Sequence, residues 1–392
     1  MPAKEVKTIK TTPELSEFCE IAKTRPYVTL DTEFLRERSY YSRLCLIQAA
    51  LPAPGRDHPG EAVLIDPIAG DLSLEPLYDL FRHRPTVKVF HAARQDLEIF
   101  YHDAGVLPQP LFDTQIAAMV CGFGEQVSYE TLVKRIARAP LDKSSRFTDW
   151  SRRPLSSDQA QYALADVTWL RQIYEHLSGR LEKTGRAPWV EEEVDVLLTP
   201  STYVTRPEDA WQRVRTRSGS PRFLAVVREL ARFRENYAQT RDVPRSRVFK
   251  DDALIELAST RPQSEADLGK SRLLLREARK GDIATGILAA VKQGMETSDL
   301  PKPAQDEPGR VGNPALSDLL RVLLKAKSDQ ANVAAKLIAS SSDLDAIASG
   351  ARDLPALSGW RAEVFGKDAL RLARGEIALS ADSGNVKIVE VG

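Results

Sequence analysis

Two acidic residues follow directly on an apolar, β-branched run in the segment Tyr27–Phe34 (YVTLDTEF). Side chains on a strand alternate between its two faces, so a strand here would point Asp31 and Glu33 to the same side. Two neighbouring carboxylates repel each other and are costly to bury, and a divalent cation with oxygen ligands usually compensates. The pair therefore suggests metal chemistry. The alternative is that the strand has ended and both acids are solvated in a turn.

Another acid occupies a position where an apolar residue is expected. Asp166 lies in the apolar stripe of a helix predicted over residues 157–184, four residues after Tyr162. This spacing puts both side chains on one helix face. The alternatives are that Asp166 forms a buried pair with Arg171 or Arg135, and that Tyr162 is an aromatic core residue.

Three further polar residues lie at predicted strand-to-helix junctions. Asp96 is in the first turn of the helix after a strand at residues 86–92, where it could simply be a favourable acid at a helix N-terminus. Asp113 follows the next short strand, and we interpret it as a plain N-cap. His91 precedes Asp96 at the mouth of the same sheet, where it could contact phosphate or sugar or be a satisfied structural histidine.

The elements that must position these acids predict a mixed sheet. Three strands at residues 27–34, 42–51 and 61–67 follow one another as a meander, and strands and helices alternate from residue 86 onward. Helices on the faces of such a sheet are typical of a ribonuclease H-like α/β fold.

Composition describes an ordinary water-soluble chain. Its 392 residues allow two or three domains, 42% of them are hydrophobic, and the net charge is zero. Three widely spaced cysteines without a CxxC motif argue against a disulfide framework or a zinc site and favour a reducing cytoplasm. No apolar run is long enough to span a membrane, and the N-terminus lacks the apolar core of a signal peptide.

Taken together, the acidic blocks resemble the three motifs of the DEDD 3′→5′ exonucleases. These are Asp-x-Glu in LDTEF, Asp in FHAARQDLEIF and Tyr-x-x-x-Asp in YALAD, in this order. The tyrosine marks the DEDDy branch, within which the chain most resembles the ribonuclease D family. This part of the resemblance covers about residues 8–185 and implies a ribonuclease H-like exonuclease domain with a mixed sheet flanked by helices.

The resemblance implies two divalent metal ions, Mg²⁺ or Mn²⁺, bound by Asp31, Glu33, Asp96 and Asp166. Two cations about 4 Å apart can stabilise the attacking and leaving oxygens of a phosphodiester and activate the water. Tyr162 would orient that water, because a phenol with an ordinary pKa near 10 is a poor base.

Substrate contacts are expected beside these acids, at Thr32, Phe34, Leu35 and His91. Phe34 and Leu35 could wedge against the terminal base, because the turn after the first strand borders the active site in this fold. Packing in the core is an equal alternative for these two side chains.

The second half of the chain is predicted to be helical, in two sets that resemble HRDC (helicase-and-RNase-D-C-terminal) domains. The first set matches through Trp211, the ARFRENYAQ helix and VPRSRVFKDD, and the second is more divergent. The predicted boundaries are an exonuclease domain at 1–185, a linker at 186–206, HRDC domain 1 at 207–296, a linker at 297–312, an HRDC-like domain 2 at 313–384 and a tail at 385–392. Both helical domains are expected to be all-α.

Positive charge is concentrated locally. Residues 201–250 contain 12 Lys and Arg against 5 Asp and Glu, whereas residues 1–180 contain 22 against 24. HRDC domain 1 is therefore expected to hold the RNA backbone, unless these charges are only solvated helix faces. The candidate phosphate contacts are Arg213, Arg215, Arg217, Arg222, Arg245, Arg247 and Lys250.

The leading functional hypothesis is a metal-dependent 3′→5′ exoribonuclease. It would trim the 3′ ends of structured RNA, above all tRNA precursors, and release nucleoside 5′-monophosphates as a cytoplasmic monomer with no membrane partner. Two alternatives remain open, a 3′→5′ DNA exonuclease and a non-catalytic RNA-binding protein.

Overall fold

The computed structural model describes residues 6–53, 60–142, 144–145, 148–216, 220–301 and 313–391. Arg217, residues 302–312 of the predicted linker and the last residue of the predicted tail lie outside the described residues. None of the helices in these ranges combines the length and apolarity needed to cross a bilayer.

A six-stranded mixed sheet organises the first part of the chain. In spatial order it contains β1 (Thr8–Ile9), β4 (Ala62–Ile65), β3 (Arg43–Ala50), β2 (Tyr27–Leu35), β5 (Val87–Phe90) and β6 (Leu111–Asp113). Strands β2, β3 and β4 pair antiparallel, as the predicted meander requires, whereas β2–β5, β5–β6 and β1–β4 pair parallel. Strand β2, which carries Asp31 and Glu33, is thus an interior strand of the sheet.

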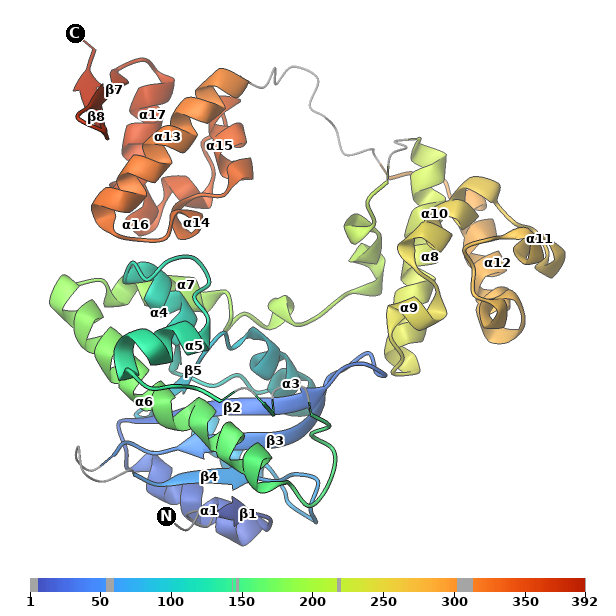
Figure 1. Cartoon of the computed structure of the whole chain (residues 1–392). Helices are drawn as coiled ribbons and strands as arrows, with labels where there is room; N and C mark the ends of the chain where they lie inside the picture. The colour runs from blue at the N-terminus through green and yellow to red at the C-terminus, as the bar shows by residue number, and fades with distance from the viewer. Residues whose placement is uncertain are drawn as a thin grey trace.

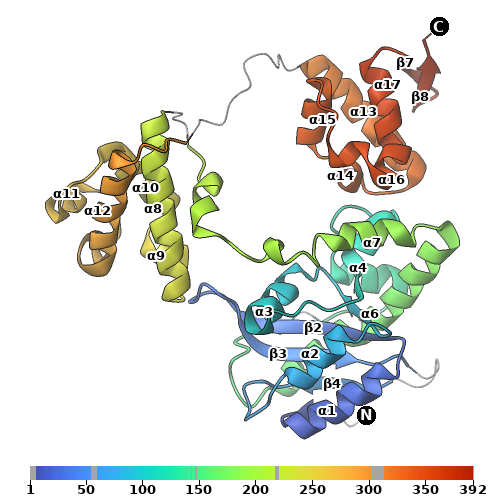
Figure 2. The ribbon, with the colours of Figure 1, turned by 180° about the vertical axis from the view of Figure 1, so that it is seen from behind.

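Helices cover both faces of this sheet, which confirms the predicted fold. The long helix α6 (Ser157–Thr184) crosses one face, and α1 (Thr12–Lys23), α2 (Glu75–Arg82) and α3 (Arg94–Ala104) lie on the other (Figures 1 and 2). The remaining helices of this part are α4 (Thr114–Val120), α5 (Tyr129–Leu132) and a π-helical turn at Val133–Ala137. Because both faces are covered, β2 begins with a fully buried run that includes Val28 and Leu30.

The segment that we predicted to be a linker, residues 186–206, is structured. It contains α7 (Ala187–Asp195) and a 3₁₀ turn at Pro200–Thr202. Val190, Val194 and Tyr203 are buried in the core of the exonuclease domain. The linker prediction was wrong because the prolines begin short helices here rather than marking an extended chain.

The first helical domain has its own apolar core. Its elements are a 3₁₀ helix (Pro207–Arg213), α8 (Pro221–Thr240), α9 (Arg245–Val248), α10 (Asp251–Thr260), α11 (Glu265–Lys270), a 3₁₀ turn (Arg276–Arg279) and α12 (Gly281–Glu296). Helices α8 and α12 approach closely at Gly294, where a Cβ atom would lie 2.6 Å from the Cα atom of Val226.

The second helical domain ends in a β-hairpin. Its helices are α13 (Pro314–Ala331), α14 (Ala335–Ile338), α15 (Ser341–Ala348), α16 (Gly359–Arg361) and α17 (Lys367–Ala373), with a 3₁₀ turn at Pro355–Leu357 and a π-helical turn at Ala362–Gly366. The hairpin pairs β7 (Ile377–Asp382) with β8 (Asn385–Glu390). The expectations of an all-α domain and of a tail at 385–392 were therefore wrong, because Ile377 is buried in the domain core and anchors the hairpin.

Both helical domains contact the exonuclease domain. Trp189 of α7 stacks on Trp360 of α16 with ring centroids 4.6 Å apart, and Arg361 forms an ion pair with Glu192 at 2.7 Å. On another side of the exonuclease domain, the loop after β2 binds the first helical domain through Tyr40. The domains are thus joined by side-chain contacts as well as by the chain.

Substitution of Gly294 by Ala should loosen the first helical domain, because the new methyl group would meet backbone atoms of α8 that cannot move independently. We expect a loss of about 1–3 kcal/mol, measured as reduced protection from hydrogen exchange in α8 and α12. The matched control is Gly269→Ala in α11, where nothing lies within 4 Å of the added atom. Equal protection in the two variants would contradict the prediction.

Candidate active site

Strand β2 and helix α6 bring three carboxylates together. One ligand oxygen from each of Asp31, Glu33 and Asp166 lies within 4.8 Å of the other two, and all three side chains are partly buried. Asp31 and Glu33 share a face of β2 because one residue separates them, and α6 crosses that face. The sequence prediction that they point the same way is confirmed.

The electrostatics of this cluster favour a cation. Burial, followed by the negative charges of Asp96, Asp166 and Glu33, raises the pKa of Asp31 well above its usual range. Neighbouring carboxylates repel one another when all of them are ionised, and a bound cation would relieve this repulsion. Their oxygen atoms are donors of the kind that Mg²⁺ and Mn²⁺ prefer. The residues present therefore fit a divalent metal site.

Asp96 lies beside this cluster rather than within it. Its carboxylate is buried in the first turn of α3 and accepts a short hydrogen bond from the hydroxyl of Thr32. Burial raises the pKa of Asp96 to about 7, although the bond from Thr32 opposes this shift. Its charge reaches Asp31, where it is the largest charge contribution to the raised pKa. Thr32 was expected to contact substrate, whereas in the structure its hydroxyl donates a hydrogen bond to the carboxylate of Asp96.

Hydrogen bonds fix the helix on both sides of Asp166. The hydroxyl of Thr29 on β2 donates to the carbonyl of Val167 at 2.9 Å, and the hydroxyl of Tyr129 donates to the carbonyl of Ala165 at 2.9 Å. This turn of α6 is therefore tied to the sheet and to α5. Such anchoring keeps an acid in place against the repulsion of its neighbours.

The two arginines considered as partners of Asp166 bind backbone carbonyls. Arg171 donates to Leu51 at 2.8 Å, and Arg135 donates to Phe123 at 3.1 Å. Both guanidinium groups stabilise chain segments of the exonuclease domain.

A cavity of about 320 Å³ opens beside the carboxylates. It is lined by Asp31, His91, Ser128, Tyr129, Glu130, Leu141, Tyr162, Asp166 and Leu170. Tyr162 lies in this lining as its position on the Asp166 face predicts, and its ring is also 6.0 Å from that of Trp150. The cavity therefore joins the candidate metal ligands to aromatic and polar groups that could meet a substrate.

Tyr129 was missed by sequence reasoning. Its ring lies 5.6 Å from that of His91, and burial raises its pKa, as do the charges of Asp166 and Asp31. His91 in turn lies 3.0 Å through Nδ1 from the hydroxyl of Thr114, and burial lowers its pKa. A tyrosine in a short helix looks like a core residue in the sequence, so only the fold reveals its place in the lining.

Asp113 is an N-cap, as predicted, and also binds a second segment. Its carboxylate accepts from the backbone amides of Gln115 at 2.7 Å, Ala92 at 3.1 Å and Ala93 at 2.8 Å. Ala92 has a left-handed backbone with φ of 56°, which is unusual for a residue other than glycine. Asp113 thus stabilises the turn that separates His91 from the helix of Asp96.

The pairing of β2 with β3 shifts in register between Glu33 and Phe34, directly after the acids. Leu35 packs against the apolar cluster of Trp150 and Ala163, so the core-packing alternative describes it well. Phe34 is partly buried beside it. Bulges are common next to active sites, where they redirect side chains.

Comparisons with known proteins identify the family. Residues 6–182 match a model described as 3′-5′ exonuclease, and residues 223–291 match the HRDC domain. The chain is 63% identical to ribonuclease D of Jannaschia sp. (strain CCS1) over 98% of its length and 99% of that protein's. It is 47% identical to ribonuclease D of Granulibacter bethesdensis, over 97% of its own length and 95% of that protein's. The chain belongs to the ribonuclease D family.

Structural similarity supports membership in the ribonuclease D family. The crystal structure of Escherichia coli RNase D, an exoribonuclease involved in structured RNA processing, matches with a TM-score of 0.81 and 31% identity, over 95% of this chain and 99% of that one. The protein is accordingly an exoribonuclease with a 3′→5′ exonuclease domain and an HRDC region, and its substrate is RNA.

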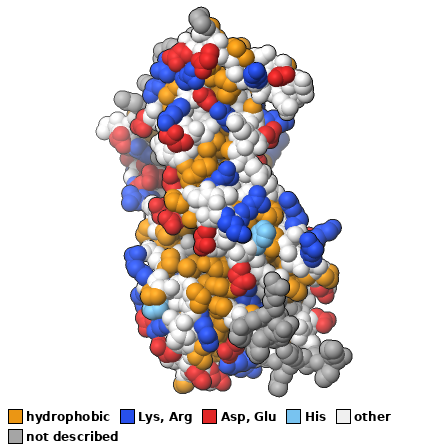
Figure 3. All heavy atoms as spheres, turned by 90° about the vertical axis from the view of Figure 1, so that its left-hand side faces the viewer, with side chains coloured by type: hydrophobic (Ala, Val, Ile, Leu, Met, Phe, Trp, Pro, Cys, Tyr) orange, Lys and Arg blue, Asp and Glu red, His pale blue; other side chains and the backbone are white. Residues whose placement is uncertain are grey.

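The predicted RNA contacts of this ribonuclease D family member fall into two groups. Arg213, Arg215, Arg247 and Lys250 are exposed. Arg222 instead donates to three carbonyls at the end of α12, those of Gly294, Met295 and Thr297. Arg245 forms an ion pair with Glu235 at 2.5 Å. On the face in Figure 3, formed by other parts of the chain, basic and acidic side chains are intermixed.

Asp31→Asn should stabilise the metal-free protein at alkaline pH. An acid whose pKa is raised by folding favours folding while it is protonated, and this stability is lost as pH rises through the folded pKa. Removing one charge at pH 8 should therefore raise the melting temperature by about 2–4 °C, the shift produced by ~1 kcal/mol in a domain of this size.

The same variant should lose most of the stabilisation by Mn²⁺, which at a hundredfold excess over Kd would be about 2.7 kcal/mol for the unsubstituted protein. Thermal melts with and without Mn²⁺ at pH 5.5 and 8 measure both effects. Asp158→Asn, an exposed acid on the same helix, is the control. A lower melting temperature at pH 8 with an undiminished response to Mn²⁺ would contradict the prediction.

Proposed function

We propose that this exoribonuclease trims the 3′ ends of structured RNAs, tRNA precursors in particular, and releases nucleoside 5′-monophosphates with two divalent metal ions. The observation that carries this proposal is the cluster of Asp31, Glu33 and Asp166 at the edge of a cavity large enough for a nucleotide's reactive end. The chain acts as a monomer in the cytoplasm, where its three buried free cysteines remain reduced.

Four carboxylates would hold the ions, Asp31, Glu33, Asp96 and Asp166. When bound, the two cations supply an activated water and charge stabilisation at the attacking and leaving oxygens. Thr32 orients Asp96 through its hydroxyl, and the bonds of Thr29 and Tyr129 hold the α6 turn, so the donors are in place before substrate arrives. Preorganised ligands of this kind avoid reorganisation during the reaction.

Tyr162 and His91 act on the substrate side of the cavity. Tyr162 is on the same helix face as Asp166, and its hydroxyl orients the attacking water by a hydrogen bond. His91 is kept neutral by burial, and it bonds a phosphate or sugar oxygen while Thr114 sets the orientation of its ring. Phe34, which follows the register shift after Glu33, borders the terminal base, whereas Leu35 supports it from the apolar cluster of Trp150 and Ala163.

The RNA body is held by the HRDC domain. Arg213, Arg215, Arg247 and Lys250 remain candidates for phosphate contacts because they are exposed. Arg222 and Arg245 are not proposed as phosphate contacts. The guanidinium group of Arg222 binds carbonyls at the end of α12, and that of Arg245 binds the carboxylate of Glu235. The E. coli relative, described as involved in structured RNA processing, supports a structured substrate.

Asp166→Asn should reduce mononucleotide release from a 3′-extended RNA by at least about 10³-fold, ~4 kcal/mol of transition-state stabilisation, because a metal ligand is lost. Tyr162→Phe removes only an orienting hydroxyl and should lose about 10²-fold. Release of labelled 5′-monophosphate in Mg²⁺ measures both.

Asp158→Asn, on the first turn of the same helix, should retain full activity. Full activity in Asp166→Asn would refute the mechanism. Faster degradation of a matched single-stranded DNA than of RNA would refute the proposed substrate.

Arg247→Ala combined with Lys250→Ala should raise the KM for a 3′-extended tRNA precursor about tenfold and lower the salt dependence of binding by about one to two units of log–log slope. A short single-stranded RNA that reaches only the exonuclease domain should be degraded unchanged. The control is Arg276→Ala with Lys292→Ala, two exposed cations of the same domain. Equal effects of both pairs on the tRNA precursor would show that only total charge matters.

A further inference from the structure

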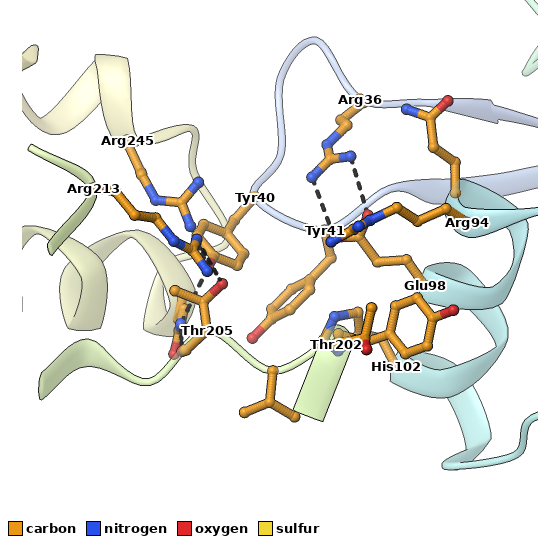
Figure 4. A pocket seen from close by; sticks show the side chains of 14 residues that line it. Arg36, Tyr40, Tyr41, Arg94, Glu98, His102, Thr202, Thr205, Arg213 and Arg245 are labelled. Atoms are coloured by element: carbon orange, nitrogen blue, oxygen red, sulfur yellow. Dashed lines mark hydrogen bonds and ion pairs between the residues drawn. The ribbon is translucent and has the colours of Figure 1, made fainter. Parts of the chain in front are cut away.

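A second cavity lies where the exonuclease domain meets the HRDC domain. It has a volume of about 530 Å³, and its walls come from the loop after β2, from α3, from residues 202–205 and from the HRDC domain (Figure 4). None of the proposed metal ligands lines it. It is therefore a separate site that exists only because the two domains are docked together.

The lining is rich in positive charge. Arg36 and Arg94 enter from the exonuclease side, whereas Arg213 and Arg245 enter from the opposite side (Figure 4). Among the described residues of the lining, Glu98 is the single acid. Four guanidinium groups around one cavity favour an anionic occupant, and guanidinium is well suited to phosphate.

Two of these arginines are already neutralised and two are available. Arg36 pairs with Glu98 at 3.2 Å, and Arg245 pairs with Glu235. Among the residues that the structure describes, Arg94 and Arg213 pair with no acid, and both are exposed. Arg213 donates only to the hydroxyl of Thr205 there, at 3.1 Å.

An aromatic side chain lies between the two groups of arginines. Tyr41 projects into the cavity, with its ring 4.6 Å from that of His102 and 4.8 Å from that of Tyr40 (Figure 4). Its backbone amide donates to Asp242 of the HRDC domain at 3.0 Å, so the docking of the domains anchors the backbone that carries the ring, and His102 and Tyr40 pack against the ring itself. Positive charge with a fixed aromatic ring is the combination that binds single-stranded nucleic acid.

Two elements lead from the proposed metal ligands to the lining of this cavity. Arg36 follows Glu33 by three residues on the chain that leaves β2, which corresponds to about 10 Å. Arg94 lies in the same first turn of α3 as Asp96. Successive phosphates of a stacked strand are about 3.4 Å apart along its axis, so the distance corresponds to roughly three nucleotides.

We propose that this junction cavity binds the RNA strand about three nucleotides upstream of its 3′ end, with Arg94 and Arg213 on backbone phosphate and Tyr41 against a base. The inference rests on the proposed function, because it takes the direction of the strand from a 3′ end held at the carboxylates. It gives the domain junction a role in substrate binding that neither domain could fulfil alone.

The test uses the full-length protein and two RNAs, a dinucleotide and a single-stranded octanucleotide. Arg94→Ala combined with Arg213→Ala should raise the KM for the octanucleotide at least tenfold with kcat unchanged, and leave kcat/KM for the dinucleotide unchanged. The control pair, Arg25→Ala with Arg276→Ala, removes the same charge from exposed positions outside the cavity and should leave both RNAs unaffected. Tyr41→Leu should weaken octanucleotide binding about 5- to 100-fold, and Tyr41→Phe should retain it.

An octanucleotide KM that is the same in the cavity pair and the control pair would overturn the inference. If the unsubstituted protein released no mononucleotide from either RNA, the proposed function would fail instead. Fluorescence anisotropy of the octanucleotide in EDTA then tests RNA binding by the cavity separately from catalysis. Weaker binding by the cavity variant than by the control variant would support the inference, and equal binding would overturn it. Thermal melts of all variants identify any that fail to fold.

Discussion

Repulsion between the carboxylates of β2 and α6 is the constraint on which this structure depends. Asp31, Glu33 and Asp166 are held within 4.8 Å of one another, and Asp96 adds its charge from α3. Like charges at this distance separate unless the backbone that carries them is fixed. Strand β2 provides one fixed element, because it pairs with β3 along the acids and with β5 just before them. The hydrogen bonds to both neighbours of Asp166 provide the other.

The same constraint explains residues whose role is to hold the candidate metal ligands in place. Asp113 cross-links the turn before α3 by accepting from Ala92 and Ala93, and so maintains a strained backbone beside the acids. Thr32 points away from the three-carboxylate cluster and holds Asp96. Such supporting groups keep a repulsive set of acids together, because the backbone that carries them cannot relax, and the resulting arrangement fits a divalent cation.

Much of the exonuclease domain could be predicted from the sequence because its signals are local. The alternation that places Asp31 and Glu33 on one face and the helical spacing of Tyr162 and Asp166 depend only on strand and helix geometry. Tyr129 could not be found in this way, since its place in the cavity depends on how α5 folds back onto α6. The C-terminal hairpin was missed because short alternating segments become strands only where an anchor such as Ile377 finds a core.

Tertiary docking also decides which charges are available. Arg222 and Arg245 look like their exposed neighbours in the sequence, yet the fold gives them carbonyl and carboxylate partners. The basic composition of residues 201–250 therefore overstates the charge that can meet a phosphate. Conversely, Arg94 is unremarkable in a nearly neutral domain and becomes part of a basic cavity only when the HRDC domain closes it.

The loop after β2 links the acids to the HRDC domain physically. The hydroxyl of Tyr40 accepts from Arg245 at 2.8 Å and from Gln239 at 3.1 Å, and its backbone amide donates to Asp242 at 3.0 Å. This loop directly continues the strand that carries Asp31 and Glu33. The HRDC domain is thus connected to the strand of the candidate metal ligands through one short, hydrogen-bonded stretch of chain, so the fold fixes the two parts relative to each other through side-chain contacts as well as through the peptide chain.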